Sequence, residues 1–254
     1  MDALCDIANC SAPNAQQLCP KSCSKLIRFP INVFILFSNF SVQIFKEEIL
    51  HFSFISLADP NCYDDFGFVV DVSGSVESHW QRERSFIKRL AQPIWISPEG
   101  GHASVELFSR TAGLMIPFDK FANFSGFERA LDDLTQWHGT TRIDLGLEVA
   151  MDEMFQLSNG MRPGHSHTLV LITDGHQTGT YKIDYEEFRK KLNDRKIRVL
   201  VILVGNSNKD QIRHLVNKKS DMYEAKDFDD LIRDEFINKI NLCEGRKLTH
   251  IESI

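Results

Sequence analysis

Short apolar runs alternate with amphipathic stretches between residues 62 and 243. Six runs have the length and composition of strands: 66–71, 103–108, 114–118, 168–174, 198–205 and 222–225. Apolar residues at helical spacing predict helices near 80–94, 127–134, 143–154, 185–196, 210–217 and 227–242. Apolar strands that alternate with helices are typical of a parallel sheet covered on both faces. The pattern therefore predicts an α/β fold, a doubly wound, mostly parallel six-stranded sheet with helices on both faces.

The rest of the chain differs from this region in composition, and we expect four segments: 1–25, 26–61, 62–243 and a C-terminal tail at 244–254. Residues 26–57 hold seven phenylalanines and only four charged side chains. The stretch from Phe29 to Phe45 is uncharged, but its 17 residues include several polar ones. A membrane-spanning helix needs about 20 mostly apolar residues. A connector is therefore favoured over a transmembrane helix, and a stretch foreign to the mature protein is a further alternative.

Composition and charge narrow the classes of partner. The chain of 254 residues is 43% hydrophobic and 25% charged, which is ordinary for a globular protein. Its 29 basic and 35 acidic side chains give a net charge of -6. Binding to a phosphate backbone needs a concentrated basic face, and no such cluster of Lys and Arg is visible. Nucleic acid is therefore not the expected partner.

Cysteine placement indicates an oxidising compartment. Four of the six cysteines crowd the first 23 residues: Cys5, Cys10, Cys19 and Cys23. Such a dense, even set favours disulfides and a secreted, extracellular protein, while a zinc site is the competing interpretation. Asn123-Phe124-Ser125 is a candidate glycosylation site and agrees with secretion. No signal peptide is visible at the N-terminus, so we expect an incomplete precursor or a mature fragment rather than a cytosolic chain.

Oxygen-bearing side chains follow several of the predicted strands, where ligands bind in open α/β sheets. The first predicted strand ends in Asp71-Val-Ser73-Gly-Ser75, and the fourth ends in Thr173-Asp174-Gly175. Between them lies the loop Gly139-Thr140-Thr141. Together these loops could bring two carboxylates and three hydroxyls to one point. Hard oxygen ligands of this kind suit Mg²⁺ or Mn²⁺.

These three motifs, in this order and at these intervals, resemble the metal-ion-dependent adhesion site of von Willebrand factor type A domains. The resemblance covers about residues 62–243 and implies the Rossmann-like fold of that family. It implies that Ser73, Ser75 and one threonine bind the cation directly, and that Asp71 and Asp174 bind it directly or through water. Thr141 is the favoured threonine, and Thr140 is the alternative.

The resemblance also implies partners and a disulfide. A cation with neutral hydroxyl ligands is only partly neutralised, so it can accept an Asp or Glu carboxylate from a protein ligand, such as a collagen-like or other matrix protein. Cys62 and Cys243 flank the domain like the end-to-end disulfide of secreted members, although two unpaired thiols are the alternative. Residues 1–25 more faintly resemble the end of an ShK-toxin-like module that lacks its final cysteine.

The expected function is therefore that of a secreted adhesion or extracellular-matrix module. The alternative is a structural matrix protein, in a mineralised matrix for example, that uses the fold without metal. An enzyme is disfavoured because the chain shows neither the Gly-x-Ser-x-Gly motif of hydrolases nor a P-loop. His165 and His167 look like a metal pair, but we expect both to lie in a surface loop.

Overall fold

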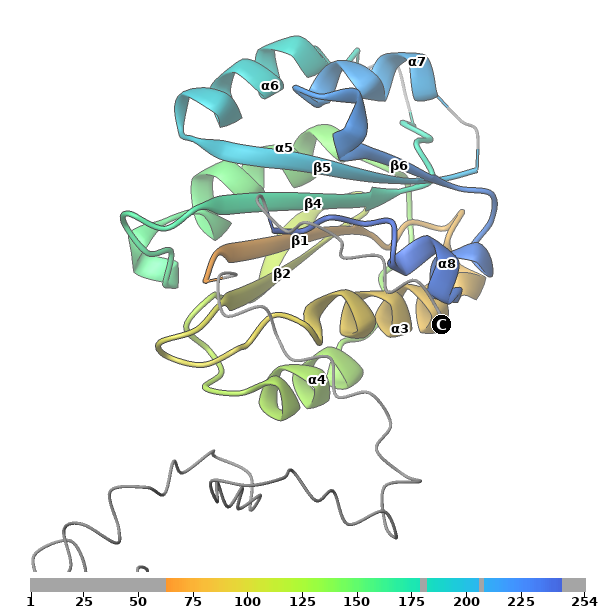
Figure 1. Ribbon diagram of the computed structural model, residues 1–254. Helices are drawn as coiled ribbons and strands as arrows, with labels where there is room; N and C mark the ends of the chain where they lie inside the picture. Colours follow the sequence, from red (N-terminus) through yellow and green to blue (C-terminus); the bar gives the residue numbers. More distant parts are fainter. Residues whose placement is uncertain (1–62, 179–181, 206–207, 244–254) are drawn as a thin grey trace, which may run out of the picture. The chain divides into compact units, whose positions relative to one another are not determined.

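The computed structural model describes residues 63–178, 182–205 and 208–243 (Figure 1). The expectations for segments 1–25 and 26–61, for Cys62 and for the tail at 244–254 lie outside these residues. Within them, no helix combines the length and the apolar character that crossing a membrane requires.

The described residues form a six-stranded sheet in the order β3-β2-β1-β4-β5-β6. Its strands are β1 (Asp65–Asp71), β2 (His102–Phe108), β3 (Ala112–Ile116), β4 (His167–Thr173), β5 (Ile197–Val204) and β6 (Met222–Ala225). All neighbours pair in parallel except β3, which is antiparallel to β2. The predicted mostly parallel, doubly wound sheet is confirmed.

Strand β3 begins and ends two residues earlier than predicted. The N–H of Ser109 donates to the carbonyl of Thr111 at 2.8 Å, which closes a tight turn directly after β2. Pairing with β2 therefore resumes at Ala112. At the other end the strand stops before Pro117, which has no N–H to donate to a ladder.

Helices cover both faces of the sheet (Figure 1). They are α3 (Trp80–Ala91), α4 (Phe124–Asp133), α5 (Ile143–Val149), α6 (Tyr185–Asp194), α7 (Lys209–Ile212) and α8 (Asp234–Ile237). Helix α5 continues into one π-helical turn, η3 (Ala150–Met154). One apolar cluster includes side chains of α3, α4 and α8, and the other includes side chains of α5, α6 and α7.

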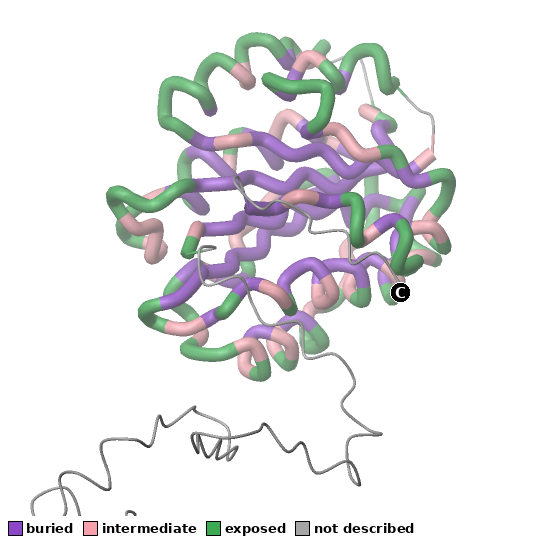
Figure 2. Tube along the Cα trace, in the orientation of Figure 1, coloured by how far each residue is buried: buried purple, intermediate pink, exposed green. Residues whose placement is uncertain are grey.

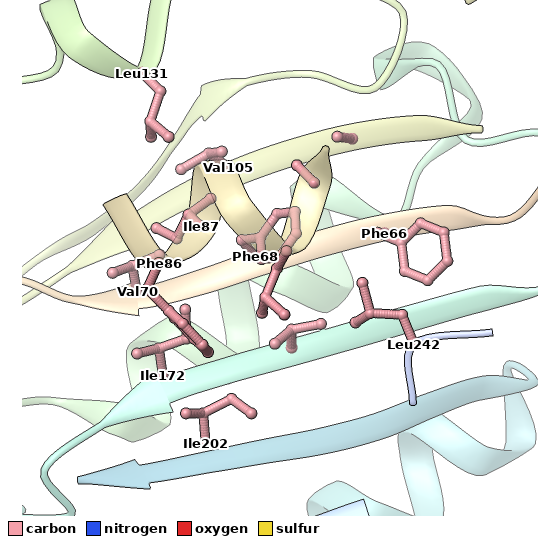
Figure 3. Packing of buried hydrophobic residues seen from close by; sticks show 14 of the residues in the cluster. Phe66, Phe68, Val70, Phe86, Ile87, Val105, Leu131, Ile172, Ile202 and Leu242 are labelled. Carbon is pink, nitrogen blue, oxygen red and sulfur yellow. The ribbon is translucent and has the colours of Figure 1, made fainter. Parts of the chain in front are cut away.

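Alternation along the strands explains why there are two clusters. Phe66, Phe68 and Val70 of β1 lie in the first cluster with Phe86 of α3 (Figure 3), whereas Val69 lies in the second. Successive side chains of a strand point to opposite faces of the sheet, so a central strand must be apolar on both. The four inner strands, β1, β2, β4 and β5, are accordingly buried almost without interruption, whereas the outer strands β3 and β6 are partly exposed (Figure 2).

The prediction of one continuous helix near 227–242 is wrong. The structure has a 3₁₀ turn, η7 (Asp230–Ile232), and the short α8, separated by the extended residue Arg233. Side-chain oxygens of Asp227 and Asp230 accept hydrogen bonds from the nearby backbone N–H groups of Asp230 and Lys226. Such local bonds compete with the helical pattern, and they explain the interruption despite the apolar spacing.

Candidate metal centre

The candidate site lies where the direction of winding changes in the sheet. From β1 the chain crosses through α3 to β2 on one side, and from β4 it crosses through α6 to β5 on the other. Connections that leave neighbouring strands in opposite directions open a crevice at their carboxyl ends. Asp71 is the last residue of β1, and Asp174 directly follows β4. The two carboxylates therefore start from adjacent strands at this edge.

The loop after β1 holds one carboxylate and two hydroxyls. Asp71 is fully buried, and its Oδ1 accepts a hydrogen bond from the N–H of Ser73 at 3.1 Å. The Oγ atoms of Ser73 and Ser75 lie 3.1 Å apart. The alternating Asp-x-Ser-x-Ser pattern thus brings its three predicted donors together.

The loop before α5 is bonded to the first loop through its backbone. The carbonyl of Gly139 accepts a hydrogen bond from the N–H of Gly74 at 2.9 Å. Gly139 has φ +134, a conformation that favours glycine, so this residue is suited to present its carbonyl there. Two residues later Thr141 is buried, whereas Thr140 is exposed.

The loop after β4 completes the arrangement. The hydroxyl of Thr173 donates to Oδ2 of Asp71 at 2.7 Å, which ties β4 to β1 beside Asp174. Asp174 is only 8% exposed, and its Oδ1 accepts from the N–H of His176 at 2.9 Å. Farther along, Thr178 and Thr141 exchange two hydrogen bonds: the N–H of Thr141 donates to Oγ1 of Thr178, and the N–H of Thr178 donates to the carbonyl of Thr141. All three predicted loops are therefore hydrogen-bonded to one another.

Sequence reasoning missed the residues that connect the loops. Thr173, Gly139 and Thr178 supply the bonds between the loops, and the motifs assign none of the three residues this role. Thr173 ends an apolar run, and a hydroxyl at the carboxyl end of a buried strand is a signal that could have identified it. The partners of Gly139 and Thr178 are 37 or more residues away, so no local pattern points to them.

The environment of Asp71 disfavours the charged form of its carboxyl group. Burial and the charge of Asp174 raise the pKa of Asp71, the hydrogen bonds from Thr173 and Ser73 lower it, and the resulting pKa is about 7. A carboxylate taken out of water in this way is costly unless a positive charge compensates it.

The chemistry of the donors fits a small hard cation. Two carboxylates and three hydroxyls supply only oxygen, as Mg²⁺ and Mn²⁺ prefer. No group of three or more His, Cys, Asp or Glu side chains able to hold a metal exists in the part of the chain that the structure describes. The proposed site contains only two such side chains, Asp71 and Asp174, because its other three expected donors are hydroxyls.

A second polar cluster lies at the opposite edge of the sheet and corrects one expectation. His165 is exposed as expected, but His167 is buried as the first residue of β4. Its Nε2 lies 3.6 Å from Asp65, which is fully buried and forms an ion pair with Arg162 at 2.6 Å. His102 flanks Asp65 on the other neighbouring strand. A guanidinium already neutralises this carboxylate, so the cluster anchors the strands.

Two known proteins are similar in sequence to this chain. The chain is 28% identical over 159 residues to von Willebrand factor A domain-containing protein 1 of Danio rerio, covering 61% of this chain and 31% of that protein. It is 24% identical over 156 residues to matrilin-1 of Gallus gallus, with the same coverage of 61% and 31%. The chain thus spans about a third of the length of these relatives.

A solved structure shows the same fold. Proximal thread matrix protein 1 from the mussel byssus superimposes with a TM-score of 0.64 at 20% identity, covering 68% of this chain and 46% of that one. Residues 65–237 match the family model of the von Willebrand factor type A domain. By its fold, its site geometry and this match, the chain belongs to the von Willebrand factor type A domain family.

Proposed function

We propose that this chain is a secreted adhesion module of the extracellular matrix, which binds a protein ligand through a divalent cation. The ligand offers an Asp or Glu carboxylate, as a collagen-like or other matrix protein would. The cation is Mg²⁺ or Mn²⁺, held by Ser73, Ser75 and Thr141 directly and by Asp71 and Asp174 directly or through water. The role is recognition rather than turnover.

The observation that carries this proposal is the bonding of three distant loops around the buried carboxyl groups of Asp71 and Asp174. Asp71 is bonded to the first and third loops, and Gly74 is bonded to Gly139 of the second. When bound, a cation supplies the missing positive charge and a coordination position for an incoming carboxylate. The chain's own residues orient the hydroxyls and exclude water from Asp71.

Two solved structures support the divalent cation and the matrix location. One solved structure of proximal thread matrix protein 1 has zinc in its MIDAS motif, the metal-ion-dependent adhesion site. A structure of the Plasmodium vivax TRAP protein is manganese-loaded. The first of these is by name a matrix protein. A divalent cation and a matrix location are therefore reasonable for the present chain as well.

A solid-phase binding assay tests the proposed function. Immobilised fibrillar collagen and a panel of matrix glycoproteins are probed with the purified chain in Mg²⁺, in Mn²⁺ and in EDTA. We expect at least one of them to be bound in Mg²⁺ or Mn²⁺ and released by EDTA, and the Asp71→Ala variant to bind none. Binding that survives both EDTA and Asp71→Ala would support the alternative, a structural matrix protein that uses the fold without metal.

Thr141 is expected to be the threonine ligand. Because Thr141 is buried and Thr140 is exposed, Thr141→Ala should weaken Mn²⁺ binding by about tenfold, whereas Thr140→Ala should leave it within threefold. Isothermal titration of both variants provides the measurement, and each is the other's control. The reverse order of affinities would assign the role to Thr140.

The disulfide between Cys62 and Cys243 is part of the proposal. Cys243 is buried and disulfide-bonded. Because Cys62 lies outside the described residues, pairing with it stays a prediction. Peptide mapping without reduction is expected to recover the two cysteines in one cross-linked fragment.

Asn123 is expected to carry an N-linked glycan when the chain is secreted from eukaryotic cells. It is the exposed N-cap of α4, and its Oδ1 accepts from the N–H of Gly126 at 2.9 Å. A glycan is attached to Nδ2, so the cap is kept. At the other end of α4, the carbonyl of Leu134 accepts a hydrogen bond from Nε1 of Trp80, the first residue of α3. Asn123 therefore lies away from the candidate metal centre.

Two variants remove the glycan without removing the oxygen that caps the helix. Ser125→Ala removes the acceptor triplet and keeps Asn123, while Asn123→Asp keeps the capping oxygen and removes the nitrogen. Both should lose one glycan in the mobility shift produced by peptide N-glycosidase and should keep the cation affinity of the wild-type chain. A shift as large in both variants as in the wild type would exclude Asn123 as the attachment site.

A further inference from the structure

Glu83 is a carboxyl group in an apolar stripe. Trp80, Glu83, Ile87 and Leu90 recur at three- and four-residue spacing along the buried face of α3. The side chain of Glu83 is fully buried, and neither of its oxygens has a hydrogen-bond partner in the part of the chain that the structure describes. A buried polar group of this kind is costly and calls for a compensating charge.

The charges that act on Glu83 belong to the candidate metal centre. Burial raises the pKa of Glu83 well above its usual range, and the carboxylates of Asp71 and Asp174 raise it further. Helix α3 also follows the loop of Ser73 and Ser75 directly, through one 3₁₀ turn (Glu77–His79). Two acidic groups of the site thus act on Glu83, and all three groups are buried.

Glu83 does not belong to the set of expected ligands. The three acidic groups do not form a cluster that could hold a metal in the described part of the chain. Any effect of Glu83 on a cation is therefore electrostatic and acts over a distance. Such an effect is strong in a buried site, because the interior has a low dielectric constant and screens the interaction between charges less than water does.

We propose, building on the proposed function, that Glu83 is the remote counter-charge of the metal centre, a buried carboxyl that strengthens cation binding without touching the cation. In the cation-free chain, Glu83 lowers the stability of the fold, because no hydrogen bond within the described residues compensates its burial. A bound divalent cation compensates Glu83 together with the two aspartates. Glu83 therefore makes the cation-free fold less stable and the cation-bound fold relatively more favourable.

The test compares Glu83→Gln with wild type in two measurements on the full chain. Isothermal titration with Mn²⁺ should show binding weakened by about tenfold, because the variant lacks the buried carboxyl group that can ionise when a cation binds nearby. Thermal unfolding in EDTA should show an unfolding temperature equal to or above that of wild type. Glu83→Leu, which continues the apolar stripe, should behave in the same way and serves if the glutamine variant does not fold.

Glu106 provides a matched control. It is a second fully buried carboxyl whose oxygens have no hydrogen-bond partner within the described residues, but it lies on β2 and is influenced by Glu153 rather than by the aspartates of the site. Glu106→Gln should therefore leave Mn²⁺ affinity within threefold of wild type. An equal loss of affinity in both glutamine variants would mean a general effect of the core and would overturn the inference.

The outcomes separate this inference from the proposed function. Wild-type affinity in both Glu83 variants, with binding abolished by Asp71→Asn, would overturn the role of Glu83 and leave the metal centre standing. Absence of Mn²⁺ binding to the wild-type chain would overturn both. Weaker binding only in the Glu83 variants supports the inference.

Discussion

Replacement of Asp71 by asparagine is expected to abolish the thermal stabilisation that Mg²⁺ or Mn²⁺ confers on this chain. At a cation concentration 100 times the Kd, binding stabilises the wild-type fold by about 2.7 kcal/mol. For a domain of this size that corresponds to a rise in unfolding temperature of roughly 5–10 °C. Asparagine can keep the hydrogen bonds with Ser73 and Thr173 but has no charge, so the rise should disappear while the fold remains.

The control for this prediction is Asp144→Asn. Asp144 is the second residue of α5, close in sequence to Thr141, and it forms an ion pair with Arg142 and accepts a hydrogen bond from Gln177. Its carboxylate is thus already compensated, and its replacement should preserve the response to cations. Differential scanning fluorimetry with and without EDTA measures both variants. A cation response in Asp71→Asn equal to that of wild type would contradict the assignment of Asp71.

Cation affinity should depend steeply on pH below neutrality. Because the pKa of Asp71 is raised to about 7, the carboxyl of the cation-free chain is protonated in acid and must lose its proton to accept a cation. Affinity for Mn²⁺ is therefore expected to fall about tenfold per pH unit below pH 7 and to level off above it. Titrations at pH 5.5, 6.5, 7.5 and 8.5 would measure this, and an affinity constant across that range would contradict it.

The same proton affects the stability of the cation-free chain with the opposite sign. The folded state keeps the Asp71 proton up to about pH 7, whereas the unfolded chain releases it near 3.8. Stability contributed by this proton is therefore fully present below 3.8 and is lost as the pH rises to 7, by up to about 1.4 kcal/mol per unit. In EDTA, Asp71→Asn should remove this part of the pH dependence, which unfolding curves between pH 4 and 8 would reveal.

Much of the fold could be predicted because its signals are local. The run 199–204 is apolar throughout, which is typical of a strand buried on both faces, so the strands and their mostly parallel order could be predicted. The motif loops follow the strands directly, and Asp71 and Asp174 therefore had to lie at one edge. Thr141 is buried and Thr140 is exposed, but which of the two binds the cation stays a prediction.

The remaining features depend on contacts that the sequence does not encode locally. The C-terminal segment has helical spacing, but side-chain bonds of Asp227 and Asp230 to nearby N–H groups interrupt it. The bond from Thr173 to Asp71 joins residues 102 positions apart. Glu83 did leave a signal, since it is a charged residue at a core position of a helical stripe. Its relation to the aspartates appears only once α3 is placed beside the site.

The most direct measurement is anomalous X-ray diffraction from crystals of this chain soaked in Mn²⁺. The proposed function predicts one strong anomalous peak within coordination distance of the hydroxyl oxygens of Ser73, Ser75 and Thr141, on the side where Asp71 and Asp174 lie. A peak bound by other side chains, or none at a saturating Mn²⁺ concentration, would contradict it.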